Sequence, residues 1–114
     1  MLTPEQLFKC LSDNTRLRCI VLLHQQGRLC VCELTEALAL SQPKISRHLA
    51  NLRQCGLLAD SREGQWVFYQ INPQLPGWVF SLLDNTQIAA KTQPWFAQDT
   101  LRLQKMKNRP EICC

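Results

Sequence analysis

Two kinds of hydrophobic spacing follow each other between residues 31 and 71, in an order that few folds can accommodate. Apolar residues first recur every three or four positions, as on one face of a helix. They form two sets: Val31, Leu34 and Leu38, then Ile45, Leu49 and Leu52. From residue 57 to 71 the apolar residues alternate instead, as in paired strands. The spacing predicts two short helices, joined by a tight turn at 39–42, and then a hairpin.

Helix boundary signals divide the rest of the chain. Thr3 and Pro4 are suited to the cap and first position of one helix, and a second helix is predicted from Asp13-Asn14 to Gly27. The next two helices are the pair described above, and the second of these runs from Ser41 or Gln42 to Gln54 or Cys55, before Gly56.

The predicted strands cover 57–60 and 65–71, with Arg62, Glu63 and Gly64 at the tip. A fifth helix begins near Trp78, and Pro94 must end, kink or restart it. Thr92 could cap a sixth helix from Gln93 to about Asn108. We expect residues 1–91 to form one domain, and 92–114 a helical segment with a cysteine-bearing tail.

This order of elements predicts a mainly α fold with a small β-hairpin, the winged helix-turn-helix, whose second helix enters the major groove of DNA. Gln42 and Arg47 can pair with purine edges, whereas Lys44 and Ser46 can hold phosphates. The predicted DNA-contacting set is Ser41, Gln42, Lys44, Ser46, Arg47, His48 and Arg62. In an isolated helix these residues would more simply be a solvated face, but the combination with the turn and hairpin favours DNA binding.

Composition restricts the alternatives. The net charge of +4 suits an anionic partner, and 114 residues suffice for one domain with little core to spare, which association into a dimer would relieve. The chain has no apolar run of membrane-spanning length and no export-signal pattern, so we expect a cytoplasmic protein that does not bind membranes. The seven cysteines are then expected to be reduced thiols. No phosphate loop, nucleophile elbow or paired-carboxylate arrangement indicates an enzyme.

The segment that begins at Leu29 is specific enough to resemble a known family. It reads LCVCELTEALALSQPKISRHLANLRQCGLLADSREGQWVFYQI and resembles the arsenical-resistance repressors of the ArsR/SmtB family, with a match from about Leu7 to Trp78. The resemblance implies a homodimer that represses its own operon of resistance genes by binding a palindromic operator, with half-sites about 34 Å apart or a multiple of that. It implies no cofactor for DNA binding, and arsenite or antimonite as inducer. Dimer packing is assigned to Trp78, Leu82 and Leu83, so that residues 1–91 are expected to be the DNA-binding and dimerisation domain.

Cys30 and Cys32 are the predicted effector site, because thiolates select soft ions. On a regular helix, residues two apart point about 200° away from each other, so both sulfurs can hold one ion only if the first turn unwinds or the helix starts after Cys30. The family's best-known form has a third cysteine where this chain has Thr35. A third ligand could come from a water-derived hydroxide, from Cys113 or Cys114, or from the other subunit.

Several alternatives stay open at this point. Cys113 and Cys114 could be ligands, an accessory trap or functionally idle, whereas Cys10, Cys19 and Cys55 are expected to be structural thiols. The fifth helix lacks the histidines that a zinc site there would need. The same fold could also respond to cadmium or lead, or to thiol oxidation, or could bind DNA constitutively.

Overall fold

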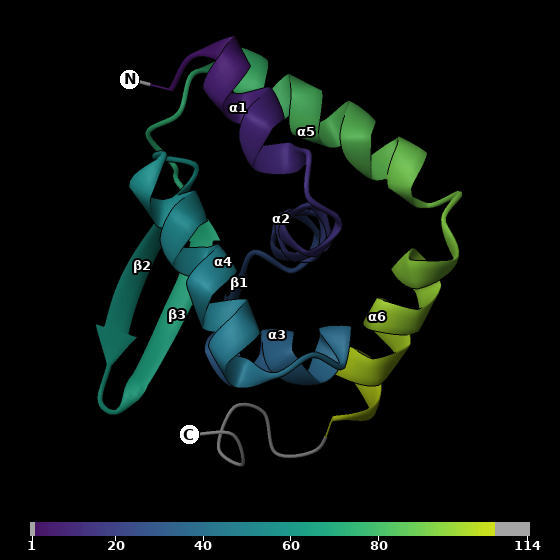
Figure 1. Cartoon of the computed structure of the whole chain (residues 1–114). Helices are drawn as coiled ribbons and strands as arrows, with labels where there is room; N and C mark the ends of the chain where they lie inside the picture. The colour runs from purple at the N-terminus through teal and green to yellow at the C-terminus, as the bar shows by residue number, and fades with distance from the viewer. Residues whose placement is uncertain (1, 107–114) are drawn as a thin grey trace.

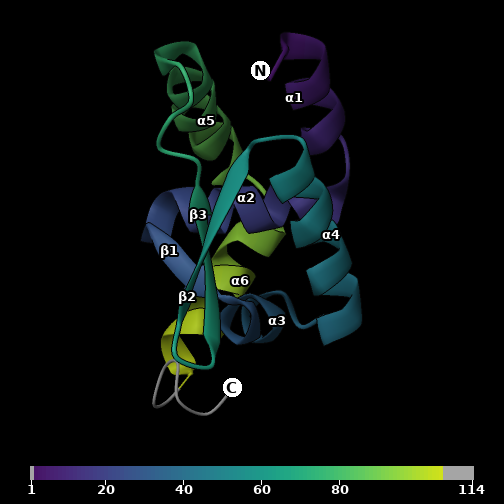
Figure 2. The ribbon, with the colours of Figure 1, turned by 90° about the vertical axis from the view of Figure 1, so that its left-hand side faces the viewer.

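The computed structural model describes residues 2–106, which form six helices and three strands (Figure 1). In chain order they are α1 (Pro4–Leu11), α2 (Asn14–Gln26), β1 (Arg28–Cys30), α3 (Val31–Leu38), α4 (Gln42–Gln54), β2 (Leu58–Glu63), β3 (Trp66–Ile71), α5 (Gly77–Ala90) and α6 (Pro94–Lys105). The helices surround α2, and the small sheet lies beside α4, as Figure 2 shows from a second direction. The predicted fold class, a mainly helical winged helix-turn-helix, is confirmed.

The first two helices begin where the sequence predicts, for the expected reason. The Thr3 hydroxyl accepts a hydrogen bond from the Gln6 N–H, and the Asp13 carboxylate accepts one from the Arg16 N–H. Each side chain satisfies a backbone donor that the first helical turn leaves without an intrahelical partner. α2 ends at Gly27, whose φ of +94° is accessible to a residue without a Cβ.

The C-terminal helix differs from its prediction at both ends. Gln93, rather than Thr92, is the N-cap residue of α6, and Pro94 starts the helix. The helix ends at Lys105 because Met106 has extended backbone angles, so it is shorter than predicted. Pro94 thus separates α5 from α6, the restart that was one of its three predicted effects.

The sheet contains a strand that hydrophobic spacing did not indicate. β1 pairs antiparallel with β3, so that Cys30 lies opposite Phe68, and the strand order is β1-β3-β2. Three residues are too few to display an alternating pattern. β2 also runs further than predicted, to Glu63, and Arg62 lies opposite Val67 within the ladder. The prediction that Arg62 occupies the hairpin tip is therefore wrong, because the turn falls at Gly64 and Gln65.

Both predicted apolar helix faces enter the core. Leu34, Ile45, Leu49 and Leu52 are fully buried, and only Val31 of the two sets is left half-buried. Leu103 of α6 is buried in the same core. The segment after residue 91 therefore has no hydrophobic core of its own within the described residues.

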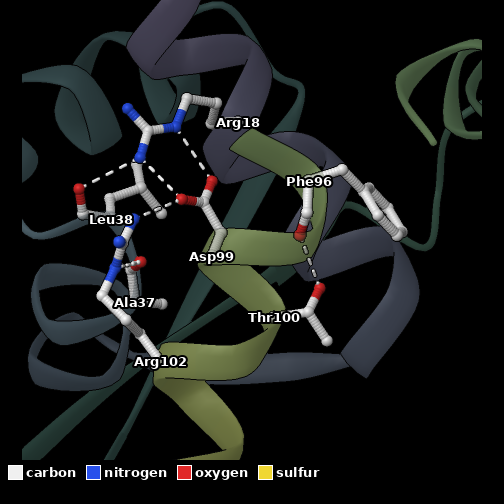
Figure 3. A network of polar contacts seen from close by, with 7 residues as sticks. All are labelled: Arg18, Ala37, Leu38, Phe96, Asp99, Thr100 and Arg102. Atoms are coloured by element: carbon white, nitrogen blue, oxygen red, sulfur yellow. Dashed lines mark hydrogen bonds and ion pairs between the residues drawn. The ribbon is translucent and has the colours of Figure 1, made fainter. Parts of the chain in front are cut away.

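An ionic network fastens α6 to α2 and α3 (Figure 3). The buried Asp99 carboxylate accepts hydrogen bonds of 2.6 and 2.9 Å from Arg18 and one of 2.9 Å from Arg102. The same two guanidinium groups donate to the carbonyl oxygens of Leu38 and Ala37, at 3.0 and 2.7 Å. They satisfy carbonyl groups that the C-terminal end of α3 leaves without intrahelical partners.

None of the helices within residues 2–106 is both long and apolar enough to cross a membrane.

Candidate functional site

The exposed side of α4 carries polar side chains, as its periodicity predicts. Ile45, Leu49 and Leu52 anchor the opposite side, which leaves Gln42 and Arg47 exposed and Lys44 and Ser46 half-buried. Ser41 is the N-cap residue but makes no side-chain capping bond. The N–H groups of the first turn are thus available to an external acceptor such as a phosphate oxygen. Figure 2 looks onto the side of the molecule where α4 and the β2–β3 hairpin lie next to each other.

Some arginines of the protein are neutralised by nearby carboxylates. Arg53 pairs with Asp60 at 3.2 Å, Arg28 pairs with Glu63, and Arg18 pairs with Asp99. By contrast, within residues 2–106 no carboxylate forms an ion pair with the three cations predicted to contact DNA. These are Lys44, Arg47 and Arg62. Their positive charge is left to attract an external anion.

His48 departs from its prediction. Its side chain is only 13% exposed and lies over the start of α2, with Nδ1 3.9 Å from the Asp13 carboxylate and 3.5 Å from the Arg16 guanidinium. It lies three residues after the buried Ile45, so helical geometry places it at the edge of the buried face. Burial lowers the pKa of His48, and the Arg16 charge acts in the same direction, against the opposing effect of Asp13. His48 is therefore a contact between helices rather than an exposed DNA contact.

Cys30 and Cys32 lie on two different elements. Cys30 is the last residue of β1 and the N-cap of α3, with extended backbone angles of −83° and 165°, whereas Cys32 is the second residue of α3. The helix thus starts after Cys30, one of the two conditions under which both sulfurs could hold one ion. Cys30 is fully buried and Cys32 half-buried.

Glu33 organises the junction between these two cysteines. Its carboxylate is buried and accepts a 2.9 Å hydrogen bond from the Cys30 N–H, as part of a capping box at the start of α3. A single turn of chain is therefore fixed to the sheet at Cys30 and to the helix-turn-helix at Cys32.

No third ligand accompanies the pair in the part of the chain that the structure describes. There, no group of three or more histidine, cysteine or carboxylate side chains lies together in a metal-binding arrangement. The Thr35 hydroxyl donates to the Val31 carbonyl at 2.9 Å, so its hydrogen is already used within the helix. Cys113 and Cys114, predicted as additional ligands, lie outside the described residues.

The residues assigned to dimer packing fall into two groups. Leu83 is 2% exposed and belongs to the core of its own chain, so it offers no surface to a partner. Trp78 is 41% exposed and Leu82 is half-buried on the same helix. Phe8 on α1, 58% exposed, was not predicted as part of this surface, although it is the one bulky apolar residue of α1 outside the core. α1 and α5 project from the same end of the molecule in Figure 2.

Two polar clusters were missed from sequence. Asp99 joins Arg18 across 81 positions, and the Cys10 and Cys55 sulfurs meet across 45 positions, at 2.7 Å. The only local signal for the first is an acidic residue within the predicted sixth helix. For the second, each thiol is separately predicted to be structural, and no local pattern connects them.

Comparisons with known proteins agree with this geometry. A model of bacterial regulatory proteins of the arsR family matches residues 13–60. The chain is 52% identical to the arsenic resistance transcriptional regulator ArsR1 of Pseudomonas putida, over 97% of this chain and 85% of that protein. It is 54% identical to the arsenical resistance operon repressor of Escherichia coli K12, over 73% of this chain and 71% of the relative.

Solved structures share the fold. The transcriptional regulator HlyU of Vibrio vulnificus is 34% identical, with a TM-score of 0.64 over 73% of this chain and 82% of that one. The antimony-specific transcriptional repressor AntR is 27% identical, with a TM-score of 0.62 over 82% and 89%. These likenesses, together with the helix-turn-helix and the cysteine pair ahead of it, confirm the predicted resemblance: the chain belongs to the ArsR family of bacterial regulatory proteins.

Proposed function

We propose that this protein is a transcriptional repressor that binds a palindromic operator as a homodimer and leaves it when arsenite or antimonite binds Cys30 and Cys32. The relatives in Pseudomonas putida and Escherichia coli are named for arsenic resistance, and AntR is named for antimony. The observation that carries the proposal is the position of the two thiols, one at the end of β1 and one in the first turn of α3. On this proposal the protein is not an enzyme, and DNA binding needs no cofactor.

The DNA contacts follow from which polar side chains of α4 have no partner among residues 2–106. Gln42 and Arg47 are exposed and would read base edges, because amide and guanidinium groups can form paired hydrogen bonds with purines. Ser41, Lys44 and Ser46 would hold phosphates near the start of the helix, and Arg62 would do so from β2. His48 is left out of this set because its side chain is half-buried against α2.

Release would result from drawing together two thiols that lie on different elements. Cys30 is tied to the sheet by its pairing with Phe68, and the far end of α3 is tied to α2 and α6 by Arg18 and Arg102. An ion that draws both sulfurs toward itself would act on the first turn of α3 between these fixed points. A shift there would move α4 relative to the sheet, and each tenfold loss of operator affinity requires about 1.4 kcal/mol of preferential binding to the released state.

The donor set suits a thiophilic ion. Two cysteine sulfurs are soft ligands, and trivalent arsenic and antimony are thiophilic centres. The third ligand would come from a water-derived hydroxide, from Cys113 or Cys114, or from a thiol of the second subunit.

A dimer is proposed because Phe8 on α1 and Trp78 on α5 expose apolar surface, and both helices lie at the same end of the molecule. Two copies joined there would each present one α4. Their recognition helices could then enter successive major grooves, about 34 Å apart, which predicts an operator with two-fold symmetry.

The proposal can be tested by fluorescence anisotropy of labelled DNA from upstream of the gene, titrated with reduced protein and then with arsenite or antimonite. Wild type should bind with strong salt dependence and be released by either ion. The Cys30→Ser, Cys32→Ser variant should bind equally well and no longer respond. Cys55→Ser is the matched control, because it removes a half-buried thiol elsewhere and should leave the response intact.

The remaining outcomes discriminate among the alternatives. Normal release of the Cys30→Ser, Cys32→Ser variant would overturn the assignment of the effector site to these two thiols. Loss of the response only in Cys113→Ser, Cys114→Ser would place the effector site in the tail. Release by cadmium or lead, but not by arsenite or antimonite, would change the inducer. Release by peroxide without any metal, if it requires Cys30 and Cys32, would replace metal binding by thiol oxidation.

A further inference from the structure

Two cysteines outside the proposed effector site lie in direct contact. Cys10 is in the last turn of α1, and Cys55 is the C-cap residue of α4, the helix with the exposed cations. The Cys10 thiol donates a hydrogen bond to the Cys55 sulfur, with 2.7 Å between the two sulfurs. In Figure 2 the C-terminal end of α1 lies over the C-terminal end of α4. Since the sulfurs of a disulfide are about 2.05 Å apart, closing this pair requires them to approach by well under an ångström.

Small molecules can reach this pair from both sides. Cys10 lines an open surface hollow of about 240 Å³, together with Lys9, Arg16 and Asn51. Cys55 lines a second open hollow of about 410 Å³, between the start of α1 and the 72–76 loop. Cys19 is a useful contrast, because it is fully buried and lines neither hollow.

We propose that Cys10 and Cys55 form a reversible intrachain disulfide when the protein meets a peroxide, and that this pair is a modification site separate from Cys30 and Cys32. The inference goes beyond the proposed metalloid response and does not depend on it. It assigns a function to two thiols that, considered one at a time, resemble ordinary structural cysteines.

The chemistry balances in two steps. The Cys55 sulfur attacks one peroxide oxygen, the O–O bond breaks, and Cys55 becomes a sulfenic acid with release of one water. The Cys10 sulfur then attacks the Cys55 sulfur, the S–O bond breaks, and a second water leaves with the protons of the thiol and the hydroxyl. Two thiols lose two electrons in total, and the peroxide gains them. A dithiol reductant reverses the reaction by exchange.

The surroundings give the two sulfurs different roles. Burial raises the pKa of Cys10 to about 12, and its hydrogen bond to Cys55 acts in the same direction. A protonated thiol is a poor nucleophile toward peroxide, so Cys10 is the resolving thiol rather than the one oxidised first. Cys55 lines the larger hollow and is thus the sulfur that the oxidant meets.

The disulfide would join α1 to the end of α4. It closes a loop across 45 positions of the chain, which restricts the unfolded state and should raise the melting temperature of the oxidised protein by roughly 10 °C. It would also limit displacement of α4 relative to α1, and therefore relative to the end of the molecule where Phe8 and Trp78 are exposed.

The test uses the full chain with Cys30, Cys32, Cys113 and Cys114 replaced by serine, so that only Cys10, Cys19 and Cys55 remain. Reduced protein is treated with a stoichiometric amount of hydrogen peroxide, alkylated under denaturing conditions and digested with trypsin. The expected product is a crosslink between peptides 10–16 and 54–62, with two thiols lost per chain and both recovered after dithiothreitol. The melting temperature should rise on oxidation and fall again on reduction.

Other results would overturn the inference. Recovery of all three alkylated thiols would do so, as would a crosslink that contains Cys19, or a crosslinked dimer on a non-reducing gel. Cys10→Ser is the matched variant: it should fold, lose the crosslink and lose the oxidation-dependent rise in melting temperature. A rise that persists in Cys10→Ser would show that another modification causes it.

Discussion

At the scale of single residues, α4 carries two arginines with different surroundings. Arg47 is exposed and has no ion pair in the described part of the chain, whereas Arg53 is paired with Asp60. We predict that Arg47→Ala weakens operator binding by about 1–3 kcal/mol, because a guanidinium that reads a base contributes that much discrimination. The free energy of unfolding of the Arg47→Ala variant should differ from that of wild type by less than about 0.5 kcal/mol. Anisotropy titrations and urea denaturation measure the two quantities.

Arg53→Ala is the matched control for Arg47. The Arg53–Asp60 pair is partly exposed, so its loss should cost less than about 1 kcal/mol of stability. Its effect on operator affinity should be smaller than that of Arg47→Ala. If the Arg47→Ala variant and wild type bind the operator with equal affinity, Arg47 does not contact DNA.

His48 leads to a prediction about pH. Burial holds its pKa below the ordinary value of about 6.5 in the folded state, so the unfolded chain takes up the proton first as the pH falls. The stability that neutral His48 contributes is thus present above pH 6.5 and is lost on acidification below it. Urea denaturation should show that the free energy of unfolding falls between pH 7.5 and pH 5. This slope should be smaller in His48→Gln.

The control for this slope is Asn51→Ala, an exposed position on the same helix, which should keep it. The pKa of Asp13 is also lowered, chiefly by its hydrogen bond from the Arg16 N–H, so its contribution is lost only below its ordinary value of about 3.8. The two effects therefore fall in separate pH windows. An unchanged slope in His48→Gln would show that His48 titrates alike in both states.

At the scale of elements, α6 is held by charge as well as by apolar contact. Asp99 is 3% exposed and lies between two guanidinium groups that also bind the end of α3. We predict that Asp99→Asn costs about 3 kcal/mol, because it leaves the largely desolvated Arg18 without its counter-charge. Asp84→Asn removes the exposed partner of His24 and should cost less than about 1 kcal/mol.

Urea denaturation measures the free energy of unfolding of Asp99→Asn and Asp84→Asn. Similar decreases in both variants would exclude a special role for the Asp99 network. A second measurement concerns α3, whose last carbonyls depend on the same guanidinium groups. Amide hydrogen exchange in α3 should be faster in Asp99→Asn than in wild type. This element is also the one that carries Cys32, so its anchoring bears on the proposed release.

At the scale of the whole molecule, the exposed aromatic residues mark the surface at which the proposed dimer would form. We predict that Trp78→Glu weakens self-association and lowers operator affinity at least tenfold, because a charge would be buried in an apolar interface. Analytical ultracentrifugation measures the first effect and anisotropy the second. Leu101→Glu changes an exposed apolar residue on α6 and should leave the dimer intact. A Trp78→Glu protein that sediments as a dimer would move the interface elsewhere.

Local chemistry accounts for much of what could be predicted from the sequence. The spacing of Ile45, Leu49 and Leu52 determined which face of α4 is buried, and therefore that Arg47 is exposed. Thr3, Asp13 and Gly27 marked the limits of the first two helices through hydrogen bonds and backbone angles that involve only near neighbours. Signals of this kind act within one or two helical turns, so they can be seen in the sequence.

Other features were decided only by the tertiary structure. β1 exists because β3 lies beside it, and this pairing makes Cys30 part of a strand while Cys32 belongs to a helix. His48 became half-buried and Leu83 buried through the helices packed against them, although their periodicity alone was compatible with exposure. The contacts of Asp99 with Arg18 and of Cys10 with Cys55 join residues far apart in the chain. Only folding brings such groups within bonding distance, because no short-range preference of the backbone relates them.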